Sequence, residues 1–357
     1  MSHPEKILVT GGCGFIGTNF VRYLFEEAGF DGLLVNVDKL TYSGNPKNLA
    51  DLAAKAGEKH YRFEKLDITD QAAMAALFDR HGFDLVVHFA AESHVDRSIV
   101  GPGEFIQTNI VGTFSLLEAA RQAKAKGRPC RFHHVSTDEV YGSLGPTGKF
   151  LETTPYDPRS PYSASKASSD HLVRAYAHTY GLDVTVSNCS NNYGPYQFPE
   201  KLIPLMICHM LEGKPLPVYG DGKNVRDWLY VRDHCDAVWA IACRGKSGET
   251  YNIGGESEWC NIELLRHLCD IVAARLGKPA GAFEPLITYV PDRPGHDRRY
   301  AIDCTRIKRE LGWKQSVDFQ HGLEKTVDWY LGNAAWIKDV QTGEYRAWIT
   351  RNYADRT

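Results

Sequence analysis

The first 190 residues alternate short apolar, β-branched runs with longer segments of mixed polarity. The apolar runs predict strands, and the mixed segments predict helices near 70–81, 103–126 and 161–181. The predicted strands are 6–10, 33–38, 60–67, 84–90, 130–136 and 183–189. Strands that are apolar on both faces and separated by helices form a parallel sheet covered on both sides. With right-handed crossovers, this pattern predicts an α/β fold with a Rossmann-type doubly wound parallel sheet.

Beyond residue 190, proline and glycine interrupt irregular aromatic runs, which indicates a smaller, discontinuous C-terminal substrate domain. Two later segments again resemble strand and helix, and we expect them to return to the main sheet: 226–253 and about 301–312. The first predicted domain is therefore 1–190 with these returning segments. The second is built from 191–225, 254–300 and 313–357.

The composition excludes several classes of protein. A net charge of −3 on 357 residues gives no basic field for nucleic acid or an anionic membrane. Nine scattered cysteines, odd in number and never in a C-x-x-C pair, fit reduced thiols better than disulfides or a zinc site. The start MSHPEKILVTGG has no apolar signal core, and no apolar run reaches the ~18 residues of a membrane helix. We expect a cytoplasmic protein without a metal.

A glycine-rich turn follows the first predicted strand and opens a helix. Its glycines at 11, 12, 14 and 17 allow a tight turn, a close backbone approach to a pyrophosphate, and helix N-terminal amides that face it. Asp38, about 20 residues further on, is suited to the adenosine ribose and would repel a 2′-phosphate, which favours NAD over NADP. Lys39 beside it could instead hold that phosphate. Asp67 is either an adenine contact or a helix N-cap in DITD.

The segment SPYSASKASSDHL places Tyr162 and Lys166 four residues apart on a predicted helix that Ser160 caps and Pro161 opens. That spacing puts both side chains on one face. The ammonium, together with the positive charge of a nicotinamide, can lower the pKa of the tyrosine from about 10 toward neutrality and make it a base for a sugar hydroxyl. Two other Y-x-x-x-K matches do not fit: Tyr61 and Lys65 lie in a predicted strand, roughly 13 Å apart, and 219–223 spans a turn.

Seven motifs together resemble the extended short-chain dehydrogenase/reductase family, from residue 5 to past 330. They are TGGCGFIG (10–17), AAESHVDRS (90–98), STDEVYG (136–142), YSASK (162–166), NNYGPYQFPEKLIPL (191–205), RDWLYVRDH (226–234) and RPGHDRRYAID (293–303). The resemblance is strongest to members that dehydrate a dTDP-linked glucose. One departure is Cys13, where members often carry alanine.

The resemblance implies a reaction for the triplet after the fifth strand. Tyr162 would take the proton of the hydroxyl on sugar carbon 4 while NAD accepts the hydride, with Thr137 bonded to that oxygen. Glu139 would then remove the proton on carbon 5, and Asp138 would protonate the leaving hydroxyl on carbon 6. Because one carboxyl group acts as an acid and the other as a base, the two must have different pKa values. Because adjacent strand residues point to opposite faces, the chain must leave the strand by Asp138.

The resemblance also implies the ligand contacts. For NAD they are Gly11, Gly14, Phe15, Ile16, Gly17, Asp38, Lys39, Asp67, Ile68, Ala90, Tyr162 and Lys166. For dTDP-glucose they are Ser93, Asn191, Lys201, Tyr219, Arg226, Asn261, Arg293, His296 and Tyr300, with Arg226 and Arg293 on the phosphates. His94, Asp96 and Arg97 are interpreted as loop residues near both ligands, not as metal ligands. Family members commonly form homodimers through helices such as those at 103–126 and 161–181.

Other functions remain open at this point. A nucleotide-sugar 4-epimerase needs the tyrosine and lysine but has no use for an acid and base pair, and a sugar-acid decarboxylase has no hydroxyl to expel. A dehydratase acting on UDP-glucose differs only in a thymine methyl, whose contact the sequence does not locate. A non-catalytic NAD-binding regulator on the same fold would be expected to have lost Tyr162, Lys166 or Thr137.

Overall fold

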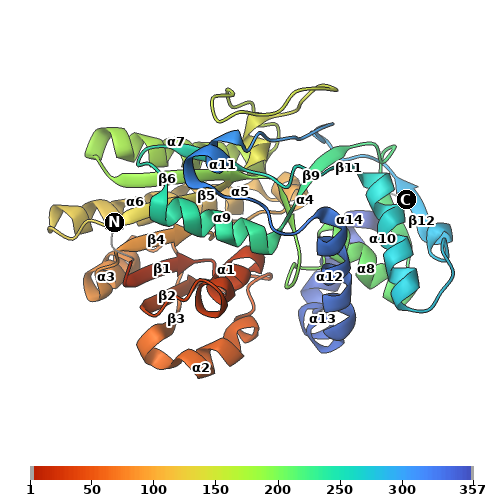
Figure 1. Ribbon diagram of the computed structural model, residues 1–357, viewed down its shortest axis with the longest axis horizontal. Helices are drawn as coiled ribbons and strands as arrows, with labels where there is room; N and C mark the ends of the chain where they lie inside the picture. Colours follow the sequence, from red (N-terminus) through yellow and green to blue (C-terminus); the bar gives the residue numbers. More distant parts are fainter. Residues whose placement is uncertain (1–3, 355–357) are drawn as a thin grey trace.

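A computed structural model describes residues 4–354. Its main feature is a seven-stranded parallel sheet in the order β10-β6-β5-β4-β1-β2-β3 (Figure 1). The strands are β1 (Lys6–Thr10), β2 (Leu33–Asp38), β3 (Tyr61–Lys65), β4 (Leu85–His88), β5 (Arg131–Thr137), β6 (Asp183–Cys189) and β10 (Thr250–Ile253). The predicted Rossmann-type α/β fold is confirmed. The chain reverses its direction of winding between β1 and β4, which is where such sheets bind ligands.

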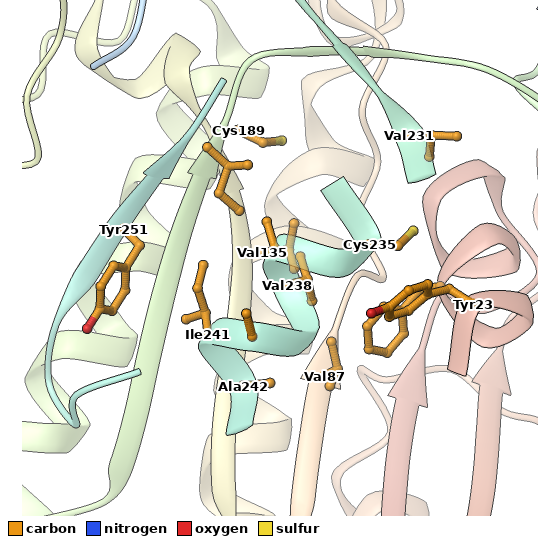
Figure 2. Close-up of a cluster of buried hydrophobic side chains, with 14 of the residues drawn as sticks. Tyr23, Val87, Val135, Cys189, Val231, Cys235, Val238, Ile241, Ala242 and Tyr251 are labelled. Atoms are coloured by element: carbon orange, nitrogen blue, oxygen red, sulfur yellow. The ribbon is translucent and has the colours of Figure 1, made fainter. Parts of the chain in front are cut away.

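Helices cover both faces of this sheet because its strands are apolar on both sides. In β1, Ile7 and Val9 pack into one layer and Leu8 into the other. Figure 2 shows the first layer, where α9 lies against the sheet through Val238 and Ile241. This layer contains α1 (Phe15–Glu26), α9 (Val231–Arg244) and α11 (Thr305–Leu311), and the other contains α3 (Gln71–His81), α6 (Gly112–Ala125) and α7 (Pro161–Tyr180).

A smaller part with its own apolar core lies beside the carboxyl ends of the main strands (Figure 1). Its strands form two sheets, β11-β9-β7 and β12-β8. They are β7 (Asn191–Tyr193), β8 (Leu216–Tyr219), β9 (Val225–Tyr230), β11 (Glu258–Cys260) and β12 (Ile287–Val290). Its helices are α8 (Leu202–Glu212), α10 (Asn261–Arg275), α12 (Phe319–Gly332), α13 (Ala334–Val340) and α14 (Gly343–Ala354). No helix within 4–354 is long and apolar enough to cross a membrane.

The segment predicted as one helix at 103–126 is three consecutive elements. They are α5 (Pro102–Phe105), a π-helical segment (Ile106–Val111) and α6, preceded by the short α4 (Val95–Val100). Within the π-helical segment, the buried amide of Asn109 binds the main chain of Glu92 at 2.8 and 3.0 Å and Ser165 Oγ at 2.8 Å. These partners lie far away in sequence, so the local pattern carried no sign of them.

The segment 226–253, predicted to return to the main sheet, divides between the two parts. Helix α9 and strand β10 do return, but β9 pairs with β7 and β11, and its Trp228 and Tyr230 enter the second core. Near 301–312, α11 packs in the main core with Ile302. The pattern did not predict α2 (Ala50–His60), α8, α10, α12, α13 or α14. Helix α8 is buried on most sides and contains Pro204, so it has no clear polar face.

Candidate active site

One cavity opens at the carboxyl ends of the main strands, above the N-terminus of α1. We call it the α1 cavity. Its wall includes ten of the twelve residues predicted for NAD: Gly11, Gly14, Phe15, Ile16, Gly17, Asp38, Lys39, Asp67, Ile68 and Ala90. Tyr162 and Lys166 are not in its wall, although Val135, whose carbonyl accepts a hydrogen bond from the Lys166 ammonium at 2.9 Å, is.

The turn at the base of the α1 cavity has the shape that a pyrophosphate requires. Gly11 has φ +73°, and a Cβ there would lie 2.7 Å from the main chain of Ala90. A Cβ at Gly17 would lie 2.1 Å from the carbonyl oxygen of Gly11. Gly14 caps α1 without a side-chain hydrogen bond, so no side chain covers the first amides of the helix at that point. The residues present therefore fit a dinucleotide.

Asp38 ends β2 and faces the α1 cavity with its carboxylate fixed by two amides. The main-chain nitrogens of Leu40 and Cys13 donate to it at 2.8 and 3.0 Å. Lys39 forms an ion pair with Asp67 at 2.8 Å. Asp67 is not the helix N-cap that one interpretation of DITD suggested, because Asp70 caps α3 by accepting from Ala73. The carboxylate of Asp67 thus neutralises the lysine that could have held a 2′-phosphate.

Helix α7 carries Tyr162 and Lys166 and begins as the sequence indicated. Ser160 and Ser163 form a capping box, and Pro161 occupies the first turn. Thr137 lies close enough to Tyr162 for its hydroxyl to act against the rise in the pKa of the phenol. The ammonium of Lys166 is buried and binds the carbonyl of Val135. The tyrosine, the lysine and the end of β5 therefore meet at one place.

The triplet Thr137, Asp138 and Glu139 stands where β5 ends. Thr137 is the last strand residue, and Asp138 begins a one-turn 3₁₀ helix, Asp138–Tyr141, in which the Thr137 hydroxyl accepts from the Glu139 amide at 3.3 Å. The chain has therefore left the strand by Asp138. This exit was expected, because both carboxylates can reach one ligand only if the strand has ended by that residue. Asp138 is buried, and its Oδ2 has no hydrogen-bond partner within residues 4–354.

The two carboxyl groups have different surroundings. Burial raises the pKa of Asp138 well above its usual value, and the carboxylates of Glu139 and Asp227 raise it further. Burial also raises the pKa of Glu139, but three cations oppose that rise. They are Arg293, Lys201 and Arg226. Asp138 is therefore the group that more readily holds a proton, and Glu139 the one that more readily ionises.

The pKa of Tyr162 is governed first by its burial in the protein. Burial raises it well above the usual value, the charge of Glu139 adds to the rise, and the Thr137 hydroxyl opposes it. The predicted lowering relies on the Lys166 ammonium together with the positive charge of the nicotinamide, and burial of the phenol acts against it. Ionisation of Tyr162 requires further positive charge near the ring.

A second cavity adjoins the first, and we call it the arginine cavity. It lies between β5, the smaller part and α14, and Glu139 is in its wall. Seven of the nine residues predicted for the sugar nucleotide line it: Asn191, Lys201, Tyr219, Arg226, Asn261, Arg293 and His296. Glu200 and Lys201 line both cavities, so the two adjoin. The end of β5 lies between them, since Val135 lines the first and Glu139 the second.

Several polar atoms in the wall of the arginine cavity are buried without a protein partner. They are Asn191 Oδ1, Asn261 Oδ1 and Arg293 Nε, which find no hydrogen bond within the described chain. Arg293 also pairs with Asp96 at 3.2 Å, and Asp96 accepts from the Tyr219 hydroxyl at 2.8 Å. Buried polar groups are normally paired, so these atoms indicate a polar ligand. The part of the chain that is described holds no group of three or more candidate metal ligands.

Two predicted residues lie elsewhere. Tyr300 is in neither cavity wall: it is buried, donates to Asp297 at 2.6 Å, and has the Arg226 guanidinium 4.3 Å from its ring centre. Ser93 lines the α1 cavity, and its carbonyl accepts from Lys201 at 2.8 Å.

Sequence reasoning missed Glu200 and Tyr42. Tyr42 donates to Glu200 at 2.8 Å, and Arg97 pairs with Glu200 at 2.9 Å while stacking over Tyr42. The sign of Glu200 in the sequence is an acidic residue next to Lys201 in the otherwise apolar segment 198–205.

A parallel doubly wound sheet, a glycine turn under α1, and a Tyr-x-x-x-Lys helix beside a second, polar cavity define an extended short-chain dehydrogenase/reductase. The comparisons with known proteins agree. A model of the family described as GDP-mannose 4,6 dehydratase matches residues 8–326, and the chain belongs to that family.

The relatives are more specific than the family. The chain is 54% identical to a dTDP-glucose 4,6-dehydratase of Shigella flexneri, over 98% of this chain and 99% of the relative. It is 57% identical to one of Xanthomonas campestris, over 95% and 97%. A solved dTDP-glucose 4,6-dehydratase of Streptomyces venezuelae, with NAD and a second ligand bound, superimposes with a TM-score of 0.86 at 46% identity, covering 94% and 99%. These relatives agree with the predicted cofactor.

Proposed function

We propose that the protein catalyses the NAD-dependent dehydration of dTDP-glucose to dTDP-4-dehydro-6-deoxyglucose. The observation that carries this proposal is the position of Asp138 and Glu139. They follow the end of β5, between the α1 cavity and the arginine cavity, next to Thr137 and close to Tyr162. A dehydratase needs an acid and a base in addition to the tyrosine. The full-length relatives named dTDP-glucose 4,6-dehydratase support the same substrate.

Each residue of the site has a separate role in the proposed reaction. Tyr162 takes the proton from the hydroxyl on carbon 4, and the Thr137 hydroxyl orients the same oxygen. Glu139 removes the proton from carbon 5, which the new ketone has made acidic. Asp138, kept neutral by burial and by its neighbouring carboxylates, protonates the hydroxyl that leaves carbon 6. Bound NAD⁺ supplies a reversible hydride acceptor, and its positive charge favours the ionised form of Tyr162.

The arginine cavity supplies the binding groups. Arg226 and Arg293 present guanidinium groups that suit the two phosphates of a nucleoside diphosphate. Asn191 and Asn261 present amide oxygens that have no partner within residues 4–354, and Lys201 stands where both cavities meet. In the α1 cavity, Asp38 would hold the ribose of the cofactor, and the amides of Gly14 to Gly17 would hold its pyrophosphate.

The test is a panel of dTDP-, UDP-, CDP- and GDP-glucose, each incubated in heavy water. We expect a 4-keto-6-deoxy product from dTDP-glucose, with solvent deuterium on carbon 5 and no net reduced cofactor, and slower turnover of the others. A product without deuterium on carbon 5 would contradict the elimination. Faster turnover of UDP-glucose than of dTDP-glucose would show that the nucleobase of the substrate is uracil and not thymine. Interconversion of two sugars without loss of water would identify an epimerase, a class represented among the solved structures at 31% identity.

We also propose a homodimer, in the cytoplasm, where the nine free cysteines would stay reduced. The support for the dimer is an apolar surface along α4, the π-helical segment and α6. Val100 is 64% exposed and Ile106 44%, and Ile99 and Phe114 are exposed beside them in sequence. Exposed apolar residues that gather on one surface are typical of protein–protein interfaces.

Val100→Glu or Phe114→Glu is expected to convert the dimer into a monomer, because each places a charge in the proposed apolar interface. Light scattering coupled to gel filtration measures the mass. It should give twice 40.0 kDa for the wild type and 40.0 kDa for either variant. Tyr289→Glu is the matched control, since Tyr289 is 55% exposed on β12 in the smaller part. A wild-type mass of 40.0 kDa would contradict the dimer.

A further inference from the structure

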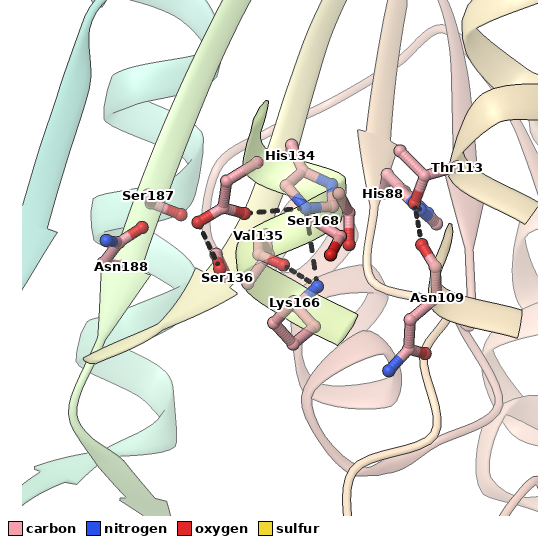
Figure 3. Close-up of polar contacts among 12 residues, drawn as sticks. His88, Asn109, Thr113, His134, Val135, Ser136, Lys166, Ser168, Ser187 and Asn188 are labelled. Carbon is pink, nitrogen blue, oxygen red and sulfur yellow. Dashed lines mark hydrogen bonds and ion pairs between the residues drawn. The ribbon is translucent and has the colours of Figure 1, made fainter. Parts of the chain in front are cut away.

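Helix α7 continues the spacing of Tyr162 and Lys166 by one more step, to Asp170. Residues at i, i+4 and i+8 lie along one helix face, so all three face β5. There the Nε2 atom of His134 lies 3.5 Å from the Lys166 ammonium and 3.2 Å from Asp170 Oδ1. His134 and Asp170 are completely buried. Figure 3 shows Lys166 reaching both Val135 and His134 from the helix.

The surroundings of Asp170 hold it as a carboxylate. Its Oδ2 accepts hydrogen bonds from the Ser136 hydroxyl of β5 at 2.9 Å and from the Tyr156 hydroxyl of the preceding loop at 2.8 Å. Tyr156 in turn accepts from Arg174, one turn further along α7, at 2.7 Å. Hydroxyl donors and a nearby guanidinium favour the ionised form. The pKa of Asp170 is lowered despite burial, mainly through His134 and Lys166.

The surroundings of Lys166 do not hold its charge by themselves. Its one short hydrogen bond is to the neutral carbonyl of Val135, and burial lowers its pKa. Two acidic groups act against that lowering, Asp170 and Cys189. The pKa of the Cys189 thiol is raised to about 12, so it is uncharged. Asp170 is therefore the anion that balances the ammonium.

His134 stands between these two charges as a neutral ring. Burial and the charge of Lys166 lower its pKa to about 4. Its other neighbours add no negative charge: His88 lies 5.2 Å away, ring to ring, with a pKa also lowered by burial. With its proton on Nε2, a neutral imidazole presents that N–H toward Asp170 Oδ1, 3.2 Å away, and leaves the ammonium bound to Val135.

We propose that Asp170, held against β5 by His134, is a positioning residue that keeps Lys166 protonated and so governs the ionisation of the catalytic tyrosine. This rests on the function proposed above for Tyr162 and Lys166. It adds Asp170 and His134 to the machinery of the reaction, although neither residue lines the α1 cavity or the arginine cavity.

The test is the pH dependence of kcat in Asp170→Asn, which keeps the size of the side chain and removes its charge. Without the carboxylate the pKa of Lys166 falls further, so the ammonium is lost at lower pH, and Tyr162 ionises at higher pH. We expect the alkaline limb of the profile to move down by about one pH unit and the acid limb to move up. At the wild-type optimum, kcat should fall about tenfold, with KM for dTDP-glucose changed less than about twofold.

Ser136→Ala is the matched control, because it removes one hydrogen bond from the same carboxylate and leaves the charge. Its two pH limbs should stay in place. If Asp170→Asn does not fold, His134→Gln should move the alkaline limb in the same direction. A uniform loss of kcat at all pH values, with unmoved limbs, would overturn the proposal in either variant. A wild type that does not dehydrate dTDP-glucose at any pH would instead refute the proposed function.

Discussion

Tyr162→Phe is expected to lower kcat by about 10³-fold and to prevent formation of reduced cofactor even in a single turnover. The phenol is the only group that the proposed mechanism offers as a base for the hydroxyl on carbon 4. Thr137, which lies beside it, is a hydroxyl with no useful basicity. The lysine cannot replace the tyrosine, because its ammonium is directed at Val135. Loss of the phenolic oxygen therefore stops the reaction at its first step.

The measurement is the absorbance of reduced cofactor after rapid mixing with dTDP-glucose. Substrate affinity, measured by calorimetry, should change little, because Tyr162 is not in the wall of the arginine cavity. Tyr289→Phe is the control, since it removes the same atom from an exposed tyrosine. Normal formation of reduced cofactor in Tyr162→Phe would refute the role of Tyr162 as the base.

Glu139→Gln is expected to separate the two halves of the reaction. Oxidation at carbon 4 should proceed, because Tyr162 and Thr137 are unchanged. The proton on carbon 5 would have no base, so reduced cofactor should accumulate on the enzyme while product formation falls by about 10²- to 10⁴-fold. Glutamine cannot accept that proton, but it keeps the length of the side chain beside Arg226, Arg293 and Lys201.

The measurement combines the absorbance of reduced cofactor with the rate at which deuterium from solvent appears on carbon 5. Both should distinguish this variant from Tyr162→Phe, in which no reduced cofactor forms. Glu256→Gln is the control, because Glu256 is a surface residue paired with Lys308. A Glu139→Gln variant with full dehydration activity would remove Glu139 from the mechanism. Rapid exchange of the carbon 5 proton with solvent in this variant, without product formation, would also contradict the role of Glu139 as the base.

Much of the site followed from local sequence, because its parts are local structures. A glycine turn after a strand needs neighbours that are close in sequence, and Gly11 takes the positive φ that the turn requires. The Ser160 capping box and the i, i+4 spacing of Tyr162 and Lys166 are likewise properties of one helix. The exit from β5 at Thr137 followed from strand geometry and the adjacent carboxyl groups.

Other features depend on groups that are distant in the chain. Glu200 joins the two cavities only because Tyr42 and Arg97 fold against it, and Asn109 shapes a π-helical segment through Glu92 and Ser165. The sequence of β9 did not show whether this strand pairs with β7 and β11 or joins the main sheet. Its aromatic side chains would be buried in either position.

The sequence by itself determined the doubly wound sheet, the glycine turn, and the helix that carries Tyr162 and Lys166, because periodic burial and short-range hydrogen bonds specify each of them. Only the tertiary structure decided how these groups are charged. Burial raises the pKa of Tyr162 and so acts against the lowering expected from Lys166 with the nicotinamide charge, and burial beside the carboxylates of Glu139 and Asp227 raises the pKa of Asp138. The placement of Asp170 behind Lys166 is of the same kind. Desolvation and long-range charge depend on what packs around a group, and a linear pattern does not contain that information.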